Sequence, residues 1–144
     1  MNINVRKLKE NTIIPTKGTA HAAGYDLYYS GENSVIIRPG ETVMLGTGVA
    51  YEIPDGYAGF VYARSGLSTK QGLRPANCVG VVDSDYRGEV MVALHNDSKE
   101  TRMVNYGDRV AQIVISEYLN YSIQVVDELS DTERGDGGFG STGV

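Results

Sequence analysis

The C-terminal end of the chain holds the most unusual group of residues that could do chemistry. Arg134 is a forked donor that suits phosphate, and the glycines within residues 135–140 let the backbone wrap an anion. Phe139 lies in this segment rather than in a core, so its ring could stack on a nucleobase. A glycine-rich end is also the usual composition of a disordered terminus. The tail is therefore either a disordered end or a ligand-binding arm.

Two internal segments carry groups suited to anion binding and to water activation. In the segment Ala63–Gly66, Arg64 precedes a predicted helix start with Ser65 as the N-cap, which is either an anion site or an ordinary helix start. Asp83 ends an apolar strand, a costly place for an unused carboxylate, and it could orient or deprotonate a water. Tyr86 is either strand packing or a platform for a flat ligand.

Five other residues are weaker indicators. Asp26 and Gln112 interrupt apolar, strand-like segments, and a polar residue at such a position is either satisfied internally or used for a ligand. His21 and His95 lack metal-ligand spacing, so we expect them to be structural or solvated. Cys78 is predicted to be a small buried hydrophobe. None of these residues indicates a function by itself.

Short apolar runs, rather than helical periodicity, make up the elements that must position these residues. Runs rich in valine, isoleucine and tyrosine alternate with turn signals, a pattern typical of a β-sandwich or barrel. One short helix is predicted over residues 65–72 because the segment ends at a glycine. The predicted strands are Val35–Ile37, Thr42–Leu45, Val49–Ile53, Tyr57–Tyr62, Val79–Val82, Glu89–His95, Arg109–Ile115 and Tyr121–Val126.

Length and composition indicate one globular domain, since the chain has 144 residues. The net charge of −5 argues against a broad nucleic-acid-binding face, and the single cysteine excludes an internal disulfide or a multi-cysteine zinc site. No signal peptide or membrane-spanning run is evident, so we expect no membrane association and a cytoplasmic location, the host cytoplasm if the protein is viral. The composition turns polar and glycine-rich after Val126, which predicts a domain over residues 1–127 and a flexible C-terminal arm over residues 128–144.

Taken in order, five segments of the chain resemble the five motifs of the trimeric dUTP pyrophosphatases (dUTPases). The match spans residues 23–143 with near-standard order and spacing, and five motifs in register are far more specific than one. One departure is Ala63, because the family usually has proline before Arg-Ser-Gly; this alters loop stiffness and leaves the binding residues intact. The segments are Ala23–Tyr28, Ala63–Gly66, Gly80–Glu89, Gly107–Ile115 and Arg134–Gly143.

The resemblance implies an all-β fold, a distorted β jelly roll or β-clip barrel with one short helix and the flexible arm. It implies a homotrimer with three shared active sites, each built from all three subunits, in which the arm closes over a neighbour's nucleotide. The implied reaction is Mg²⁺-dependent hydrolysis of dUTP to dUMP and pyrophosphate, by in-line attack of water on the α-phosphorus. Such an enzyme removes dUTP from the DNA precursor pool and supplies dUMP for thymidylate synthesis.

The resemblance also implies a role for each matching residue. Asp83 would orient the attacking water, and Asp26 would act on magnesium through water. Tyr86 would pack on the sugar and exclude a 2′-hydroxyl, and Phe139 would stack on uracil. The residues that line the nucleoside pocket would be Asn77, Gly80, Val81, Val82, Asp83 and Met91. The phosphate-binding residues would be Arg64, Ser65, Gly66, Gln112, Arg134, Gly140, Ser141 and Thr142.

The nearest alternative is dCTP deaminase, including its bifunctional forms, which shares the fold. That family places a catalytic glutamate on the strand after the Asp83 motif, and here the strand Val90–Leu94 has no carboxylate. A non-enzymatic jelly roll would not need Asp83, Arg64 and Arg134 together with an aromatic tail. A dUTPase with a second, regulatory role through protein partners stays open.

Overall fold

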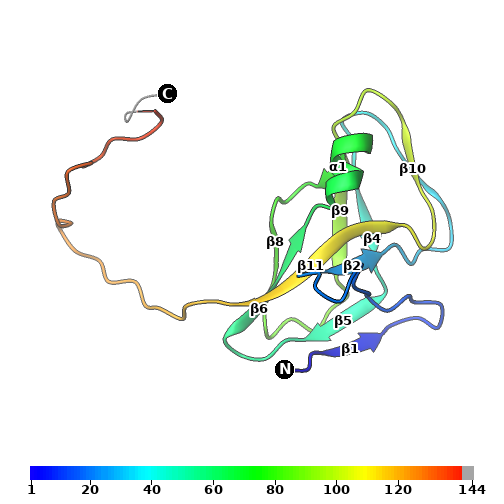
Figure 1. The fold of residues 1–144 in the computed structure, drawn as a ribbon, viewed down its shortest axis with the longest axis horizontal. Coiled ribbons are helices and arrows are strands. Elements are labelled where there is room, and N and C mark those ends of the chain that lie inside the picture. Colours follow the sequence, from blue (N-terminus) through cyan, green and yellow to red (C-terminus); the bar gives the residue numbers. More distant parts are fainter. Residues whose placement is uncertain (141–144) are drawn as a thin grey trace.

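The computed structural model describes residues 1–140 and shows a β-rich body from which the C-terminal segment runs away as an extended chain (Figure 1). Within these residues the body contains eleven strands and the short helix α1 (Ser65–Gln71). The strands are β1 (Asn4–Lys7), β2 (Tyr25–Tyr28), β3 (Val35–Ile37), β4 (Thr42–Gly46), β5 (Val49–Glu52), β6 (Tyr57–Tyr62), β7 (Leu73–Pro75), β8 (Gly80–Val82), β9 (Met91–Asn96), β10 (Arg102–Val104) and β11 (Arg109–Glu117).

The strands form antiparallel ladders that, in the described part of the chain, do not close into a single barrel. The largest sheet has the order β2-β11-β6-β8, and a three-stranded sheet has the order β4-β9-β7. The pairs β1-β5 and β3-β10 complete the body. The four internal motif segments lie on or directly after strands of the four-stranded sheet, so long-range pairing places all four on one sheet.

Apolar residues that alternate along the strands build one core between the ladders. On β9, Val92, Leu94 and Asn96 face inward and are at most 1% exposed. The Asn96 amide donates to the carbonyls of Ile37 and Glu100 and accepts two hydrogen bonds from Ser98, so this buried polar group is fully satisfied. Other fully buried side chains in the core are Leu27, Leu45, Val49, Leu73, Val110 and Ile113.

The helix differs from its prediction at one end. It ends at Gly72, which has a left-handed backbone with a φ of 67°, as the sequence predicts. The predicted N-cap role of Ser65 is wrong, because Ser65 is the first helical residue and Arg64 is the N-cap, without a side-chain cap bond. The carbonyl of Ser65 instead accepts a hydrogen bond from Thr69 Oγ1 at 2.7 Å. No helix within residues 1–140 is long and apolar enough to cross a membrane.

The all-β prediction with one short helix is confirmed, and seven predicted strands are present with small shifts at their ends. The strand predicted over Tyr121–Val126 is wrong for this single chain, because these residues run past the body with their apolar side chains exposed. Cys78 is exposed rather than buried, since it lies on the loop between β7 and β8. The predicted domain boundary at residue 127 stays a prediction.

Candidate active site

A cavity of about 440 Å³ opens between α1, β2 and β11, where three motif segments meet. Asp26 comes from β2, Arg64 from the residue before α1, and Gln112 from β11. Lys70 and Arg109 also line the cavity, so three cationic side chains and one carboxylate give its lining a net charge of +2. A cavity of this charge suits a polyanion. Its other lining residues are Gly18, Ala22, Gly24, Ser65, Gly66, Leu67 and Gln71.

Asp26 fixes two of these cations. Arg64 Nε donates to one carboxylate oxygen at 2.7 Å, and Arg109 Nη1 donates to the other at 3.4 Å. The side chain of Asp26 is 12% exposed and that of Arg64 25%, so their ion pair is largely shielded from water. Each guanidinium has five N–H donors, so most of them remain for a ligand.

A β-bulge in β11 places Arg109 on the same face of the sheet as Gln112. Gln112 pairs with Asp26 and Arg109 with Tyr28, but the register shifts between Arg109 and Ala111. Because Asp26 and Tyr28 are two residues apart on β2, their partners lie on one face. Strict alternation would put Arg109 and Gln112 on opposite faces, and the sequence analysis did not predict Arg109 as a site residue.

Gln112 is held between two of the motif segments. Its Nε2 donates to the carbonyl of Ala63 at 2.9 Å, a contact that alanine makes as well as the usual proline would. A Cβ on Gly24 would lie 2.7 Å from Gln112 Oε1, so the glycine leaves room for the amide. Lys70 was also missed by the sequence reasoning, although it follows Gly66 by about one helical turn, a spacing that could have found it.

Two smaller cavities lie near the other edge of the four-stranded sheet, around β8 and the start of β9. The sequence-predicted residues of the third motif gather there with Asn77 and Met91. One cavity, of about 200 Å³, is lined by Val81, Val82, Asp83, Tyr86, Glu89, Val90 and Met91. The other, of about 60 Å³, is lined by Val61, Pro75, Asn77, Gly80, Val81, Val82, Met91 and Val92.

Local contacts shape the cavity around Asp83. The Tyr86 hydroxyl donates to the carbonyl of Glu89 at 2.9 Å, and a Cβ on Gly88 would collide with the Tyr86 ring. The Glu89 carboxylate accepts a hydrogen bond from the N–H of Gly48 at 2.8 Å. The sequence analysis named Glu89 only as the first residue of a predicted strand and did not predict it as a site residue. Asp83 is exposed, so the argument from its burial cost is wrong for the single chain.

The cationic cavity and Asp83 lie at distant points of the sheet. Gln112 pairs with Tyr62 on β6, whereas Val82, the residue before Asp83, pairs with Gly59. Two strand spacings across and four residues along separate Gln112 from Asp83, which amounts to about 16 Å between their backbones. Within one chain the two groups of sequence-predicted residues, at Gln112 and at Asp83, therefore lie well apart on the sheet.

The tail runs away from the β-rich body (Figure 1). Arg134 Nε donates to the carbonyl of Gly137 at 2.8 Å, and Phe139 is fully exposed with a φ of 48°. Gly140 also has a positive φ, of 89°. Ser141 and Thr142, both predicted phosphate contacts, lie outside the described residues. The chain therefore does not bring its own tail to its own site.

The described residues contain no cluster of three or more His, Cys, Asp or Glu side chains that could hold a metal ion. In the cationic cavity both oxygens of Asp26 already accept hydrogen bonds from arginine. A metal at this site would therefore depend on oxygens that a ligand brings, with Asp26 reaching it through water.

The dUTPase family model matches residues 10–143 of the chain. The chain belongs to the dUTPase family. Among curated dUTPase relatives, the deoxyuridine 5′-triphosphate nucleotidohydrolase of Nautilia profundicola is 47% identical over 143 residues, 99% of each chain. That of Desulfitobacterium hafniense is 48% identical over 132 residues, 91% of this chain and 87% of the relative.

Solved dUTPases share the fold. A mutant dUTPase of Staphylococcus bacteriophage 80alpha with dUpNHpp superposes with a TM-score of 0.89 at 28% identity, over 99% of each chain. A mutant dUTPase from phage phi11 of S. aureus, in which a structural Mg(II) ion is coordinated, has a TM-score of 0.80 at 28% identity over 89% of this chain and 98% of its own. These similarities confirm the jelly-roll dUTPase fold.

Proposed function

We infer that this chain hydrolyses dUTP to dUMP and pyrophosphate. The observation that carries the proposal is the pair of complementary sites on one sheet: a cavity of net charge +2 and a nucleoside-sized cavity beside an exposed carboxylate. The first suits a triphosphate, and the second suits a base and sugar next to a group that can orient water. Membership of the dUTPase family supports the same reaction.

The proposed chemistry follows from the charges. Hydroxide that approaches a polyanion is repelled, so the site must neutralise the phosphates while it aligns a water. Arg64, Ser65, Gly66 and Gln112 would hold the phosphates, with Arg109 and Lys70 as further cations. Asp83 would accept a proton from the attacking water and orient it in line with the departing pyrophosphate.

Magnesium fits this site as a metal held mainly by triphosphate oxygens. When bound, Mg²⁺ would neutralise phosphate charge and fix the phosphate chain in one geometry. Asp26 would act through water, because Arg64 and Arg109 already occupy its oxygens. Among solved relatives, the phage phi11 dUTPase has a structural Mg(II) ion, which supports a role for this metal in the family.

We also propose that the working enzyme is a homotrimer with shared sites. The separation of about 16 Å between the backbones of Gln112 and Asp83 supports an arrangement in which a second copy supplies one half of each site. Two exposed apolar surfaces could form the contacts between copies. Tyr62 and Val81 leave apolar side chains exposed on the four-stranded sheet, and Tyr121, Ile123 and Val125 do so along the extended segment. Cyclic assembly of identical chains would bury both.

The proposed role of the tail follows from the same geometry. Arg134 would bind the β- and γ-phosphates and Phe139 would cover uracil, in a neighbouring subunit's site, with Gly140, Ser141 and Thr142 beside them. The extended course of residues 119–140 supports this reach across subunits. A nucleotide substrate also supports a cytoplasmic location for the enzyme.

Release of pyrophosphate from dUTP, dCTP, dTTP and UTP, in the presence of Mg²⁺, tests the function. We expect turnover of dUTP alone, because Tyr86 leaves no room for a 2′-hydroxyl and Asn77 reads the uracil edge. Ammonia released from dCTP at a comparable rate would instead make the chain a deaminase. Equal turnover of UTP would contradict the role of Tyr86.

A further inference from the structure

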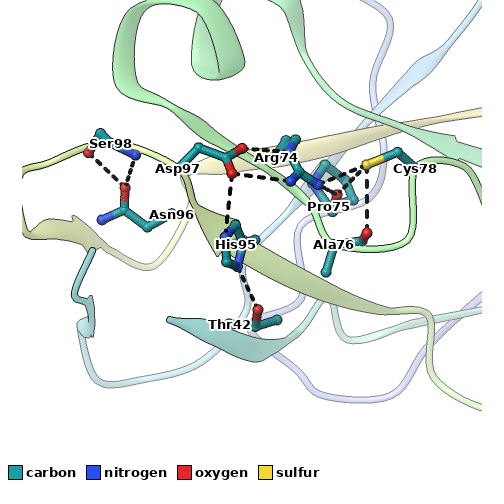
Figure 2. A network of polar contacts seen from close by, with 9 residues as sticks. All are labelled: Thr42, Arg74, Pro75, Ala76, Cys78, His95, Asn96, Asp97 and Ser98. Carbon is teal, nitrogen blue, oxygen red and sulfur yellow. Dashed lines mark hydrogen bonds and ion pairs between the residues drawn. The ribbon is translucent and has the colours of Figure 1, made fainter. Parts of the chain in front are cut away.

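A polar network across the three-stranded sheet ends on the loop between β7 and β8 (Figure 2). Arg74, on β7, donates through Nε and Nη2 to the two carboxylate oxygens of Asp97, which follows β9. Asp97 lies 3.4 Å from His95 Nε2, and His95 Nδ1 shares a hydrogen bond of 2.8 Å with Thr42 on β4. The network therefore crosses the whole three-stranded sheet β4-β9-β7.

The remaining nitrogen of the same guanidinium contacts the loop between β7 and β8. Arg74 Nη1 donates to the carbonyl of Pro75 at 3.2 Å and lies 3.0 Å from Cys78 Sγ. The Cys78 thiol donates to the same Pro75 carbonyl at 2.9 Å (Figure 2). These contacts close a turn over residues 75–78.

Asn77 is exposed on this turn. A Cβ on Gly80 would lie 3.0 Å from Asn77 Nδ2, so the amide rests against the start of β8. An exposed side chain keeps one orientation only if the backbone that carries it is fixed by surrounding contacts. In this turn the side-chain contacts that fix the backbone come from Arg74 and Cys78.

We propose that Arg74 is a positioning residue for the nucleobase, which clamps the 75–78 turn to the end of β9 and so directs the Asn77 amide toward uracil. The proposal rests on the proposed function, because it takes Asn77 as the contact to the uracil edge. A turn that is already ordered saves the cost of ordering it when substrate binds. Arginine suits this task because its planar fork grips a carboxylate on one side and leaves a donor for the turn on the other.

The exposure of the ion pair argues against stability as its main role. The side chains of Arg74 and Asp97 are 36% and 46% exposed, and ion pairs this exposed contribute little to folding. The hydrogen bonds to Asp97 and then to Cys78 raise the pKa of Arg74, so the clamp stays charged at any working pH. A purely structural role therefore predicts a slight loss of stability and an unchanged KM.

Steady-state kinetics with dUTP on Arg74→Met test the proposal. We expect KM to rise roughly fivefold to tenfold with kcat almost unchanged, because the loss falls on ground-state binding of the base rather than on water attack. The KM of Arg74→Lys should be close to that of Arg74→Met, because lysine lacks the forked donors of arginine. Arg38→Met is the matched control: it removes another exposed arginine–carboxylate pair, with Glu41, and should leave KM unchanged.

Hydrogen exchange in the substrate-free protein gives a second readout that does not depend on turnover. The backbone amides of residues 76–80 should exchange faster in Arg74→Met and at the wild-type rate in Arg38→Met. Unchanged KM and unchanged exchange in Arg74→Met would overturn the proposal. So would equal losses in kcat, binding and folded fraction, which would make Arg74 merely structural. If the wild-type chain does not hydrolyse dUTP, the proposed function fails, and unchanged exchange at residues 76–80 would then reject the clamp on its own.

Discussion

Truncation after Glu133 removes a segment that the body does not need for folding. The described residues from 134 onward form hydrogen bonds only with residues 132–137, and Phe139 is fully exposed. No apolar surface of the body is uncovered by the cut. The free energy of unfolding should therefore change by less than about 0.5 kcal/mol.

The effect of the same cut on catalysis should be large. Loss of base stacking by Phe139 costs about 1–3 kcal/mol. Loss of a charge-assisted phosphate contact from Arg134 costs about 1.5–3 kcal/mol more. Together they lower kcat/KM for dUTP by a factor of about 10² to 10⁴, since each 1.4 kcal/mol is tenfold.

Three measurements on the truncated chain separate these effects: thermal unfolding, mass in solution, and kcat/KM with dUTP. We expect an unchanged unfolding temperature, an unchanged mass in solution (that of a trimer, on the assembly proposed above) and a strongly reduced kcat/KM. Phe139→Ala should show the stacking part of the loss alone. Retention of more than about a tenth of wild-type kcat/KM would refute the reasoning, because such a loss is below about 1.4 kcal/mol, whereas the two contacts together should cost at least about 2.5 kcal/mol. Loss of the trimer would show that the arm is primarily an assembly element.

Three further substitutions test single contacts. Asp83→Asn should keep dUTP binding but lower kcat by about two to four orders of magnitude, and retained turnover would mean that another group activates water. Gly24→Ala puts a Cβ 2.7 Å from Gln112 Oε1 and should lower kcat/KM roughly tenfold. Gly18→Ala, with open space around it in the same cavity, should leave kcat/KM unchanged. Equal effects of the two substitutions would show that the contact between Gly24 and Gln112 does not matter for activity. Asn96→Ala removes four hydrogen bonds of a fully buried side chain and should lower the free energy of unfolding by about 3 kcal/mol in denaturant titration. A change below about 1 kcal/mol would mean that water replaces the amide.

The sequence predicted well those features that depend on local composition. The alternation of apolar residues located β6 and most of β9, and Gly72 located the end of the helix. Three of the motif segments meet at the cationic cavity, through Asp26, Arg64 and Gln112, whereas the third motif lies at the other edge of the sheet. The strands that it missed, β1, β7 and β10, have three or four residues each, and in each an arginine interrupts the apolar run that marks equally short strands such as β3.

Other features depend on contacts that a linear pattern does not contain. The bulge beside Val110 moved Arg109 to the Asp26 face, against strict alternation. Cys78 is exposed because of its place on a loop, whereas its residue type predicts burial. The strand-like run Tyr121–Val126 has the right composition but no partner strand within its own chain, and strand propensity alone does not form a sheet.

On the proposed assembly, dUTP is hydrolysed at a site built from two or more copies of the chain. Mixing two inactive variants tests whether sites are shared in this way. Arg64→Ala damages the cationic cavity and Asp83→Asn the carboxylate beside the nucleoside cavity. The two variants are refolded together in equal amounts. If the halves of a site come from different copies, a site is then intact wherever an Arg64→Ala copy supplies Asp83 and its neighbouring Asp83→Asn copy supplies Arg64. Pyrophosphate release from dUTP should then recover to about one quarter of the wild-type rate, as expected for random cyclic assembly. A mixture that stays as inactive as its components would contradict the shared site.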